Sequence, residues 1–191
     1  MRNLAAPIRQ YAKQTNNTGD TRAGFPSAMR SRRVILRPIT IDDAGAWKRF
    51  NNAITRRNPA WPIVPSMLYA KNELLHYDLM RERGTRTVYA VVERSSGTVI
   101  GDFHLKRFDH AKRRVEFGHA LHPRVWGSGT TYEVLNAVRN ASRRIGYTLW
   151  AKVESANIRS WKSLEKFGAT FCGERTTTLC GRRMKMRYYE L

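Results

Sequence analysis

The chain contains only two cysteines, Cys172 and Cys180, among its 191 residues. Two cysteines are too few for a disulfide framework, and their spacing fits neither a metal site nor a redox motif. We therefore expect both thiols to remain reduced, as in a cytoplasmic protein. The five histidines are scattered along the chain, so the sequence predicts no metal site.

Long apolar runs are also missing. No stretch is long enough to cross a membrane as a helix, and residues 1–7 lack the apolar segment of a signal peptide. The sequence therefore predicts a soluble, cytoplasmic protein that does not enter a membrane. Internal repeats and low-complexity segments are absent as well.

Acidic residues are scarce: 15 Asp and Glu stand against 35 Lys and Arg, which gives a formal net charge of +20. A positive field of this size attracts polyanions at moderate salt, which makes nucleic acid or the ribosome a candidate partner. The alternative is that the basic surface only attracts a small anionic ligand, or reflects a basic host proteome. The charge is spread along the chain and is not gathered in a recognisable nucleic-acid module, so both interpretations stay open.

The length and the 41% hydrophobic content allow one well-formed core and are too small for two full domains. Residues 1–33 carry seven Arg and Lys against Asp20 alone, and Asn, Gly and Pro residues interrupt any periodic pattern. We interpret residues 1–33 as a basic, flexible arm and residues 34–191 as the folded domain. The arm either docks on a polyanion or packs on its own domain through Tyr11 and Phe25.

Hydrophobic periodicity predicts a strand and two helices at the start of the domain. The strand covers about residues 34–38, and a capping box of Thr40 and Asp43 then starts the first helix. The second helix is expected over about residues 66–83, where Gly84 ends it. Three leucines are expected to face inward from this second helix: Leu68, Leu75 and Leu79.

Three consecutive antiparallel strands are expected next, at about residues 88–92, 98–108 and 115–121. After them the pattern changes to helix, strand and helix, and two final strands surround a turn at Cys180 and Gly181. This order predicts an α/β (α+β) fold with a mixed, mostly antiparallel sheet of about seven strands flanked by about four helices.

The most informative segment is the glycine-rich stretch that runs from His122 to Thr130, between the third of these strands and a helical segment. Gly127 and Gly129 can adopt positive φ and leave room for a ligand, while the free N–H groups of a helix start attract anions. Arg124 adds a positive charge. The stretch is therefore either a phosphate cradle or an ordinary tight turn.

A second motif lies about thirty residues downstream, after a predicted strand over residues 148–153. There Asn157 and Ser160 precede a Leu-Glu-Lys-Phe-Gly run over residues 164–168. Together with the Arg-x-x-Gly-x-Gly loop, this succession resembles the two core motifs of the Gcn5-related N-acetyltransferases (GNAT). The resemblance covers about residues 34–191 and is greatest to the RimJ and RimL branch, which acetylates the N-termini of ribosomal proteins.

The resemblance implies a donor, acetyl-CoA, and a loop that holds its pyrophosphate. In the family the Arg-x-x-Gly-x-Gly loop grips this group, and N–H groups from about Val125 to Thr131 would do so here. The N–H of Leu121 is a candidate for polarising the acetyl carbonyl. The residues expected to bind the donor are Leu121, His122, Arg124, Val125, Trp126, Gly127, Ser128, Gly129, Thr130 and Asn157.

The resemblance also implies that the Ser160 hydroxyl, placed by Asn157, protonates the leaving thiolate. Ser and Asn at a helix start are equally common as capping residues without a catalytic part. Some relatives carry a tyrosine where this chain has Glu165, which weakens a tyrosine-acid mechanism. Others carry a glutamate where this chain has Lys152, so no base is carried over at that position.

Glu116 is the main candidate for the base that takes the proton of the amine, directly or through water, because it is acidic among apolar neighbours. Pairing of a solvent-facing Glu116 with Arg113 or Arg114 would explain it equally well. His119 is expected in the core or on the surface. Trp61, in a proline-rich loop, is the best candidate to contact the acceptor substrate.

Two kinds of function remain for the chain. It is expected to be an N-acetyltransferase acting on a primary amine, most directly a protein N-terminus, with a small amine or an aminoacyl-tRNA as alternative acceptors. The other hypothesis is a GNAT-fold binding module attached to nucleic acid or a larger assembly by its basic surface. The sequence fits either a monomer or a homodimer.

Overall fold

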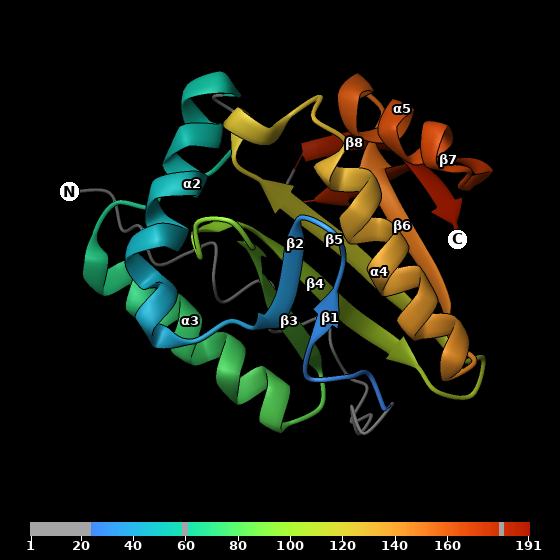
Figure 1. The fold of residues 1–191 in the computed structure, drawn as a ribbon. Helices are drawn as coiled ribbons and strands as arrows, with labels where there is room; N and C mark the ends of the chain where they lie inside the picture. The colour runs from blue at the N-terminus through green and yellow to red at the C-terminus, as the bar shows by residue number, and fades with distance from the viewer. Residues whose placement is uncertain (1–23, 59–60, 180–181) are drawn as a thin grey trace.

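The computed structural model describes residues 24–58, 61–179 and 182–191. These residues form one sheet of eight strands in the spatial order β1-β2-β3-β4-β5-β6-β8-β7 (Figure 1). Adjacent strands are antiparallel, except β5 and β6, which are parallel. The strands are β1 (Met29–Arg30), β2 (Val34–Pro38), β3 (Arg86–Glu93), β4 (Val99–Asp109), β5 (Arg114–Leu121), β6 (Thr148–Glu154), β7 (Thr170–Leu179) and β8 (Arg182–Glu190).

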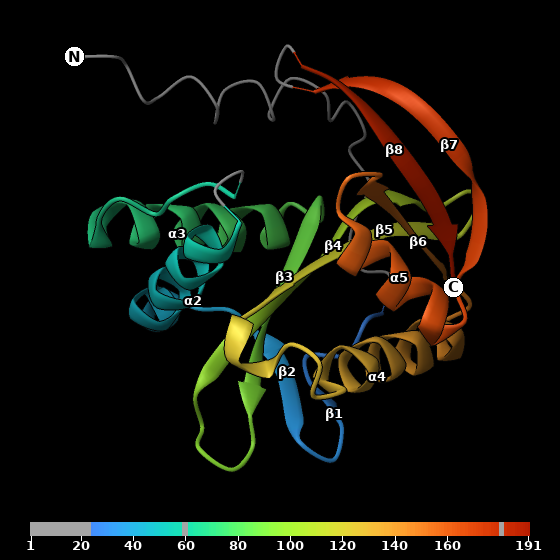
Figure 2. The ribbon, with the colours of Figure 1, turned by 90° about the horizontal axis from the view of Figure 1, so that it is seen from above.

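Four α-helices lie on the two faces of this sheet, α2 and α3 on one face and α4 and α5 on the other (Figure 2). The predicted fold class is thereby confirmed, with one more strand than expected. Within the described ranges, none of the helices is both long and apolar enough to span a membrane. The helices are α2 (Ala44–Arg57), α3 (Met67–Glu82), α4 (Thr130–Arg144) and α5 (Ile158–Phe167), with short 3-10 turns η1 (Ile41–Asp43) and η2 (Pro123–Val125).

The capping box predicted at Thr40 and Asp43 is present and starts η1, which leads into α2. Asp43 accepts the backbone N–H of Thr40 at 2.9 Å and both terminal nitrogens of Arg37 at 2.7 Å. Burial alone would raise the pKa of Asp43, but these hydrogen bonds outweigh it and hold the pKa below its ordinary value. The ionised carboxylate therefore joins β2 to the first helix.

The structure places residues 24–33 with the domain and not in a flexible arm. Met29 and Arg30 pair with Leu36 and Ile35 of β2. Met29 is buried because it joins the core between the sheet and α4, and Phe25 packs against the same core. The boundary expected after residue 33 therefore lies too late. Residues 1–23, including Tyr11, lie outside the described residues, as do Cys180 and Gly181 of the predicted last turn.

Helix α3 has the predicted extent, but the face predicted to point inward is wrong. Leu68, Leu75 and Leu79 are exposed, whereas Ala70 and Leu74 are buried. Apolar residues lie on both sides of this helix, so periodicity alone does not identify the buried one. The face that carries Ala70 and Leu74 packs in the core with residues of α2 and β3.

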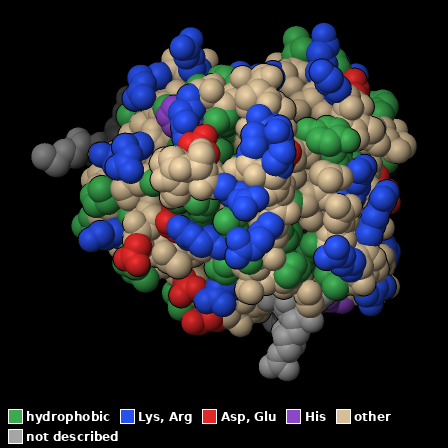
Figure 3. Space-filling model, in the orientation of Figure 1, with side chains coloured by type: hydrophobic (Ala, Val, Ile, Leu, Met, Phe, Trp, Pro, Cys, Tyr) green, Lys and Arg blue, Asp and Glu red, His purple; other side chains and the backbone are tan. Residues whose placement is uncertain are grey.

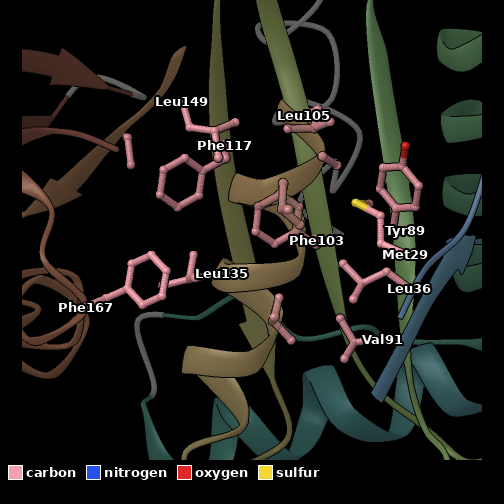
Figure 4. Packing of buried hydrophobic residues seen from close by; sticks show 14 of the residues in the cluster. Met29, Leu36, Tyr89, Val91, Phe103, Leu105, Phe117, Leu135, Leu149 and Phe167 are labelled. Atoms are coloured by element: carbon pink, nitrogen blue, oxygen red, sulfur yellow. The ribbon is translucent and has the colours of Figure 1, made fainter. Parts of the chain in front are cut away.

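The main core lies between the sheet and α4 (Figure 4). Phe103 on β4 is completely buried, and its ring stacks on Phe117 of β5 with centroids 5.7 Å apart. Leu135 from α4 and Leu149 from β6 are also completely buried in this cluster. The packing fixes β4, β5 and β6 relative to α4, and these four elements carry the residues of the site.

Candidate functional site

Strands β5 and β6 are paired along only part of their length. Their parallel ladder ends at the pair Glu116 and Trp150. Beyond this pair β5 continues over residues 117–121 and β6 over residues 151–154, with no ladder between these described segments. We call the region between the two segments the wedge. Loose strand edges of this kind offer main-chain groups to an extended ligand.

Backbone groups of β5 are directed toward the wedge. The N–H of His122 bonds to the carbonyl of Ile100 on β4 at 2.7 Å, and backbone groups alternate in direction along a strand. The N–H groups of His119 and Leu121 therefore point away from β4 and toward the wedge. The geometry suits the predicted contact of the Leu121 N–H with a ligand carbonyl, and Trp126 Nε1 already donates to the Leu121 carbonyl at 2.8 Å.

The predicted junction of strand, glycine loop and helix after β5 is confirmed. Gly127 has φ of +76° and Gly129 has φ of +82°, and Gly129 is the N-cap of α4. Side chains are disfavoured in this left-handed region. A Cβ added at Gly127 would meet no atom within 4 Å, so open space lies beside the loop.

Fewer N–H groups of this loop are free than the sequence suggests. Within the described residues, those of Gly127, Gly129 and Thr131 have no hydrogen-bond partner in the loop, and that of Thr131 lies in the first turn of α4, where no helical acceptor exists. Of the N–H groups expected to hold a phosphate, only these three are therefore available. Oxygen atoms of the loop and of His122 engage the others: Val125, Trp126, Ser128 and Thr130.

Arg124, expected to contact a phosphate, is paired with Glu93 at the end of β3. The distance from Arg124 Nη2 to Glu93 Oε2 is 2.9 Å. Hydrogen bonds from Ser96 and then from Arg124 lower the pKa of Glu93. The Arg124 side chain is 45% exposed, and exposed pairs of this kind exchange at little cost. Arg124 can therefore reach a phosphate by leaving Glu93, and its role stays a prediction.

Two arginines that the sequence analysis missed lie against the loop. Arg33 donates to the carbonyl of Ser128 at 2.8 Å and forms an ion pair with Glu133 of α4 at 2.5 Å. Arg159 of α5 lies over the ring of Trp126, 3.4 Å from its centroid. Both come from segments distant in the sequence, so only the fold brings their charge to the loop.

Asn157 is the N-cap of α5, as the capping interpretation predicts. Its side-chain oxygen accepts the backbone N–H of Ser160 at 3.3 Å. Ser160 lies in the first turn of α5, directly after the strand that forms one side of the wedge. Its hydroxyl donates to no group in the described part of the chain, so it remains available for the predicted proton transfer to the leaving group.

Glu116 is buried and ion-paired, and its side chain is only 2% exposed. Lys106 Nζ lies 3.3 Å from one carboxylate oxygen and Arg107 contacts the other. The expected partners Arg113 and Arg114, and the expected solvent-facing position, are therefore wrong. A bulge between residues 106 and 109 is the reason: Arg107 has φ of +51° and lies on the same carboxylate as Lys106.

Three cations surround this carboxylate. Burial lowers the pKa of Lys106 and of Lys152, and the charge of Glu116 opposes that shift in both. Arg107 adds a further positive charge that lowers both pKa values. Because both oxygens of Glu116 are engaged, direct acceptance of a proton would break an ion pair.

His119 and His122, the two histidines at the C-terminal end of β5, both interact with other groups of the protein. His119 stacks on Phe103, as the core interpretation expects, and burial lowers its pKa to about 4. His122 accepts the backbone N–H of Arg124 through Nδ1 at 3.0 Å. Burial, then Arg124 and Arg56, lower the pKa of His122. Both rings are therefore neutral at pH 7, and any contact of His122 with a donor stays a prediction.

Trp61 is anchored on α2 and only partly buried. Its Nε1 donates to the side-chain oxygen of Asn51 at 2.9 Å, and its ring packs against the core beneath α2 and α3. Trp61 is thus part of the packing of this layer, and its contact with an acceptor stays a prediction.

Basic side chains are scattered over the molecular face that carries α2 and α4 (Figure 3). They do not gather in one patch, in agreement with their distribution along the sequence. Among the residues that the structure describes, no three His, Cys, Asp or Glu side chains are grouped to hold a metal ion.

Comparisons with known proteins agree with this architecture. The family described as acetyltransferase (GNAT) domain matches residues 33–170, more than two thirds of the chain. No curated protein matched the sequence.

Several solved structures share the fold at low sequence identity. RimL, an α-N-acetyltransferase of a ribosomal protein, solved with coenzyme A, is 17% identical with a TM-score of 0.72, covering 87% of this chain and 96% of its own. The microcin self-immunity acetyltransferase MccE, solved with acetyl-CoA and AMP, is 15% identical with a TM-score of 0.76 and the same coverage. A ribosomal-protein-alanine acetyltransferase from Vibrio fischeri is 16% identical with a TM-score of 0.70, again with coverage of 87% and 96%.

Proposed function

The chain belongs to the acetyltransferase (GNAT) family, and from this premise we propose that it transfers the acetyl group of acetyl-CoA to a primary amine, foremost the N-terminus of a protein. The single observation that carries the proposal is the wedge between β5 and β6, which opens next to the glycine loop. Such an edge and such a loop fit an elongated donor with an anionic end.

The residues of the loop fit the phosphates of the donor. The free N–H groups of Gly127, Gly129 and Thr131 supply uncharged donors, and the open space at Gly127 gives access to them. Arg33 and Arg159 add positive charge beside the loop. We propose that these groups, with Arg124 once it leaves Glu93, bind the pyrophosphate.

The chemistry that the donor brings is an activated acetyl thioester. The protein then has to hold the thioester carbonyl, receive the proton of the amine and protonate the sulfur. We propose that the N–H of Leu121 polarises the carbonyl and that Ser160, on the helix capped by Asn157, supplies the proton to the sulfur. Glu116 is proposed to act by its charge, as the fixed carboxylate that holds Lys106 and Arg107 beside the wedge.

Two neighbours of known fold act on ribosomal proteins by their names, which supports an N-terminal amine as acceptor. The net charge of +20 supports an acceptor that belongs to a polyanion, such as a protein on the ribosome or an aminoacyl-tRNA. A basic enzyme repels an isolated basic tail, so the acceptor is proposed to be presented on RNA.

The test is acetyl transfer to a small set of acceptors, followed by mass spectrometry. The set contains peptides that begin with Ser or Ala, a small primary amine and an aminoacyl-tRNA, each incubated with acetyl-CoA and the whole chain. We expect a mass increase of one acetyl group on at least one acceptor, and none with a peptide whose N-terminus is blocked. Acetyl-CoA binding without transfer to any acceptor would contradict the proposal and favour the binding-module hypothesis.

A further inference from the structure

Two polar side chains of β4, Asp102 and His104, form a pair that the sequence analysis did not single out. The distance from Asp102 Oδ1 to His104 Nε2 is 3.2 Å. The other carboxylate oxygen of Asp102 accepts the indole N–H of Trp47, on α2, at 2.9 Å. Asp102 is 5% exposed. Burying a carboxylate costs several kcal/mol unless its charge is used, and here its partners are an imidazole and an indole.

The imidazole of His104 is held in one orientation. The ring of Tyr77, on α3, meets it edge to face, with centroids 5.5 Å apart and planes at 86°. Because the Asp102 carboxylate accepts hydrogen bonds, we assign the proton of the neutral ring to Nε2, which leaves the lone pair on Nδ1.

Nδ1 of His104 has no hydrogen-bond partner among the described residues. The His104 side chain is 18% exposed, so the ring is partly accessible to solvent. An imidazole oriented by a carboxylate, with one basic nitrogen free, is the arrangement that proton-accepting histidines use in catalysis.

The register of the sheet places this pair next to the wedge. His104 lies opposite Gly118 on β5, and Lys106 lies opposite Glu116, where the ladder to β6 ends. Gly118 is thus already in the segment of β5 that faces the wedge. A Cβ at Gly118 would meet no atom within 4 Å, and neighbouring strands lie about 4.8 Å apart. Only the backbone of Gly118 separates the strand position of His104 from the wedge.

The groups proposed to bind the donor and the groups proposed to accept the proton lie on opposite faces of the sheet. Helices α4 and α5 lie on one face, and the glycine loop leads into α4 (Figure 2). Asp102 and His104 share the other face with α2, because Trp47 of α2 bonds to Asp102. We infer that His104 is the catalytic base, which accepts the proton of the acceptor amine on this second face, and that Asp102 is its positioning residue. The inference rests on the proposed function.

The proton and bond changes balance. As the amine nitrogen bonds to the acetyl carbon, the carbon–sulfur bond breaks and its electron pair leaves on sulfur. The amine loses one proton to Nδ1 of His104, which passes it to solvent. The sulfur gains one proton from the Ser160 hydroxyl, whose oxygen regains a proton from solvent. No oxidant or metal is needed.

The charged groups around His104 favour its neutral form. Burial lowers its pKa below the ordinary value, Asp102 opposes this shift, and Arg86 of β3 and Lys106 of β4 add to it. Tyr77 of α3 meets the His104 ring edge to face, and His119 of β5, on the opposite face of the sheet, interacts with it electrostatically. A histidine with a lowered pKa is unprotonated at pH 7. The enzyme is therefore expected to lose activity on acidification only below the ordinary His pKa of about 6.5.

The test compares His104→Gln and Asp102→Asn with His110→Gln, a matched control. His110 directly follows β4, and its Nδ1 contacts the hydroxyl of Tyr147. With acetyl-CoA and a peptide that begins with Ser, His104→Gln is expected to lower kcat by about 10²- to 10⁴-fold and to remove the acidic limb of the pH profile. Asp102→Asn is expected to move that limb to lower pH, since Asp102 raises the pKa of His104, and His110→Gln to change neither.

Two further measurements distinguish a failure of this inference from a failure of the proposed function. NMR of the imidazole nitrogens should show His104 protonated at Nε2 in the wild type and a mixture of tautomers in Asp102→Asn. If the wild type acetylates no amine, the slow hydrolysis of acetyl-CoA serves as the reaction, with water in place of the amine, and the same loss is expected in His104→Gln. Equal rates and equal pH profiles in His104→Gln and the wild type, in either reaction, would overturn the inference.

Discussion

Phe103→Ala is expected to lower the free energy of unfolding by about 3–5 kcal/mol. Phe103 is completely buried and stacks on both Phe117 and His119. Its removal leaves a cavity between the sheet and α4 that close-packed neighbours fill only in part. Because total stabilities are about 5–15 kcal/mol, this loss is a large fraction of the total. Urea unfolding followed by circular dichroism measures it.

Leu75→Ala is the matched control for this variant. Leu75 is a large apolar residue too, but it is 48% exposed on the outer side of α3. We expect a change within about 0.5 kcal/mol, as for surface positions generally. A large loss in Leu75→Ala together with a small one in Phe103→Ala would show that α3 packs by the face that its leucine pattern suggests, and would contradict the described core.

Glu116→Gln is expected to lower the free energy of unfolding by about 3 kcal/mol. The substitution keeps the shape of the side chain but leaves Lys106 and Arg107 without their buried counter-charge. The value lies at the lower end of the range for broken buried pairs, because the side chains of Lys106 and Arg107 are 26% and 32% exposed. Glu190→Gln is the control, since its pair with Arg114 is 41% exposed on both sides.

The stability loss in Glu116→Gln should also depend on pH. Burial already lowers the pKa of Lys106, and the loss of Glu116 lowers it further, because the carboxylate raised it. The unfolded chain then binds more protons than the folded one, so stability rises with pH. The deficit relative to the wild type is expected to shrink as pH approaches the ordinary Lys pKa of about 10.4. A deficit independent of pH, or equal to that of Glu190→Gln, would contradict the role given to this ion pair.

Local patterns in the sequence predicted the parts of the site that depend on neighbouring residues. The glycine loop, the start of α4 and the cap of α5 by Asn157 each follow from a few adjacent residues, and each is present. Turn and cap chemistry is decided within one or two helical turns, so no knowledge of the tertiary structure is needed.

Residues whose role depends on distant partners could not be predicted. Arg33 reaches the glycine loop only because β1 and β2 bring it beside α4. The partners of Glu116 depend on a bulge in β4, and a bulge changes which side chains share a face. Asp102 and His104 alternate with apolar residues in β4. In a sequence this pattern indicates a strand with one side facing solvent. Their burial under α2 and α3 is a property of the fold.

The measurement that tests the account most directly is acetyl-CoA binding by calorimetry at moderate salt, on the wild type and on Gly127→Glu. The new carboxylate would enter the open space beside the loop and repel the donor phosphates. Gly173→Glu is the control, because Gly173 also has a positive φ, of +120°, and equally open surroundings. It lies in β7 at the edge of the sheet, where β6 and β8 separate it from the wedge. Moderate salt suppresses nonspecific attraction by the net charge.

We predict micromolar binding to the wild type and to Gly173→Glu, and binding at least about 100-fold weaker in Gly127→Glu, a difference of about 2.7 kcal/mol. Equal binding in all three proteins would contradict the account, since the glycine loop would then be a turn that does not hold the donor.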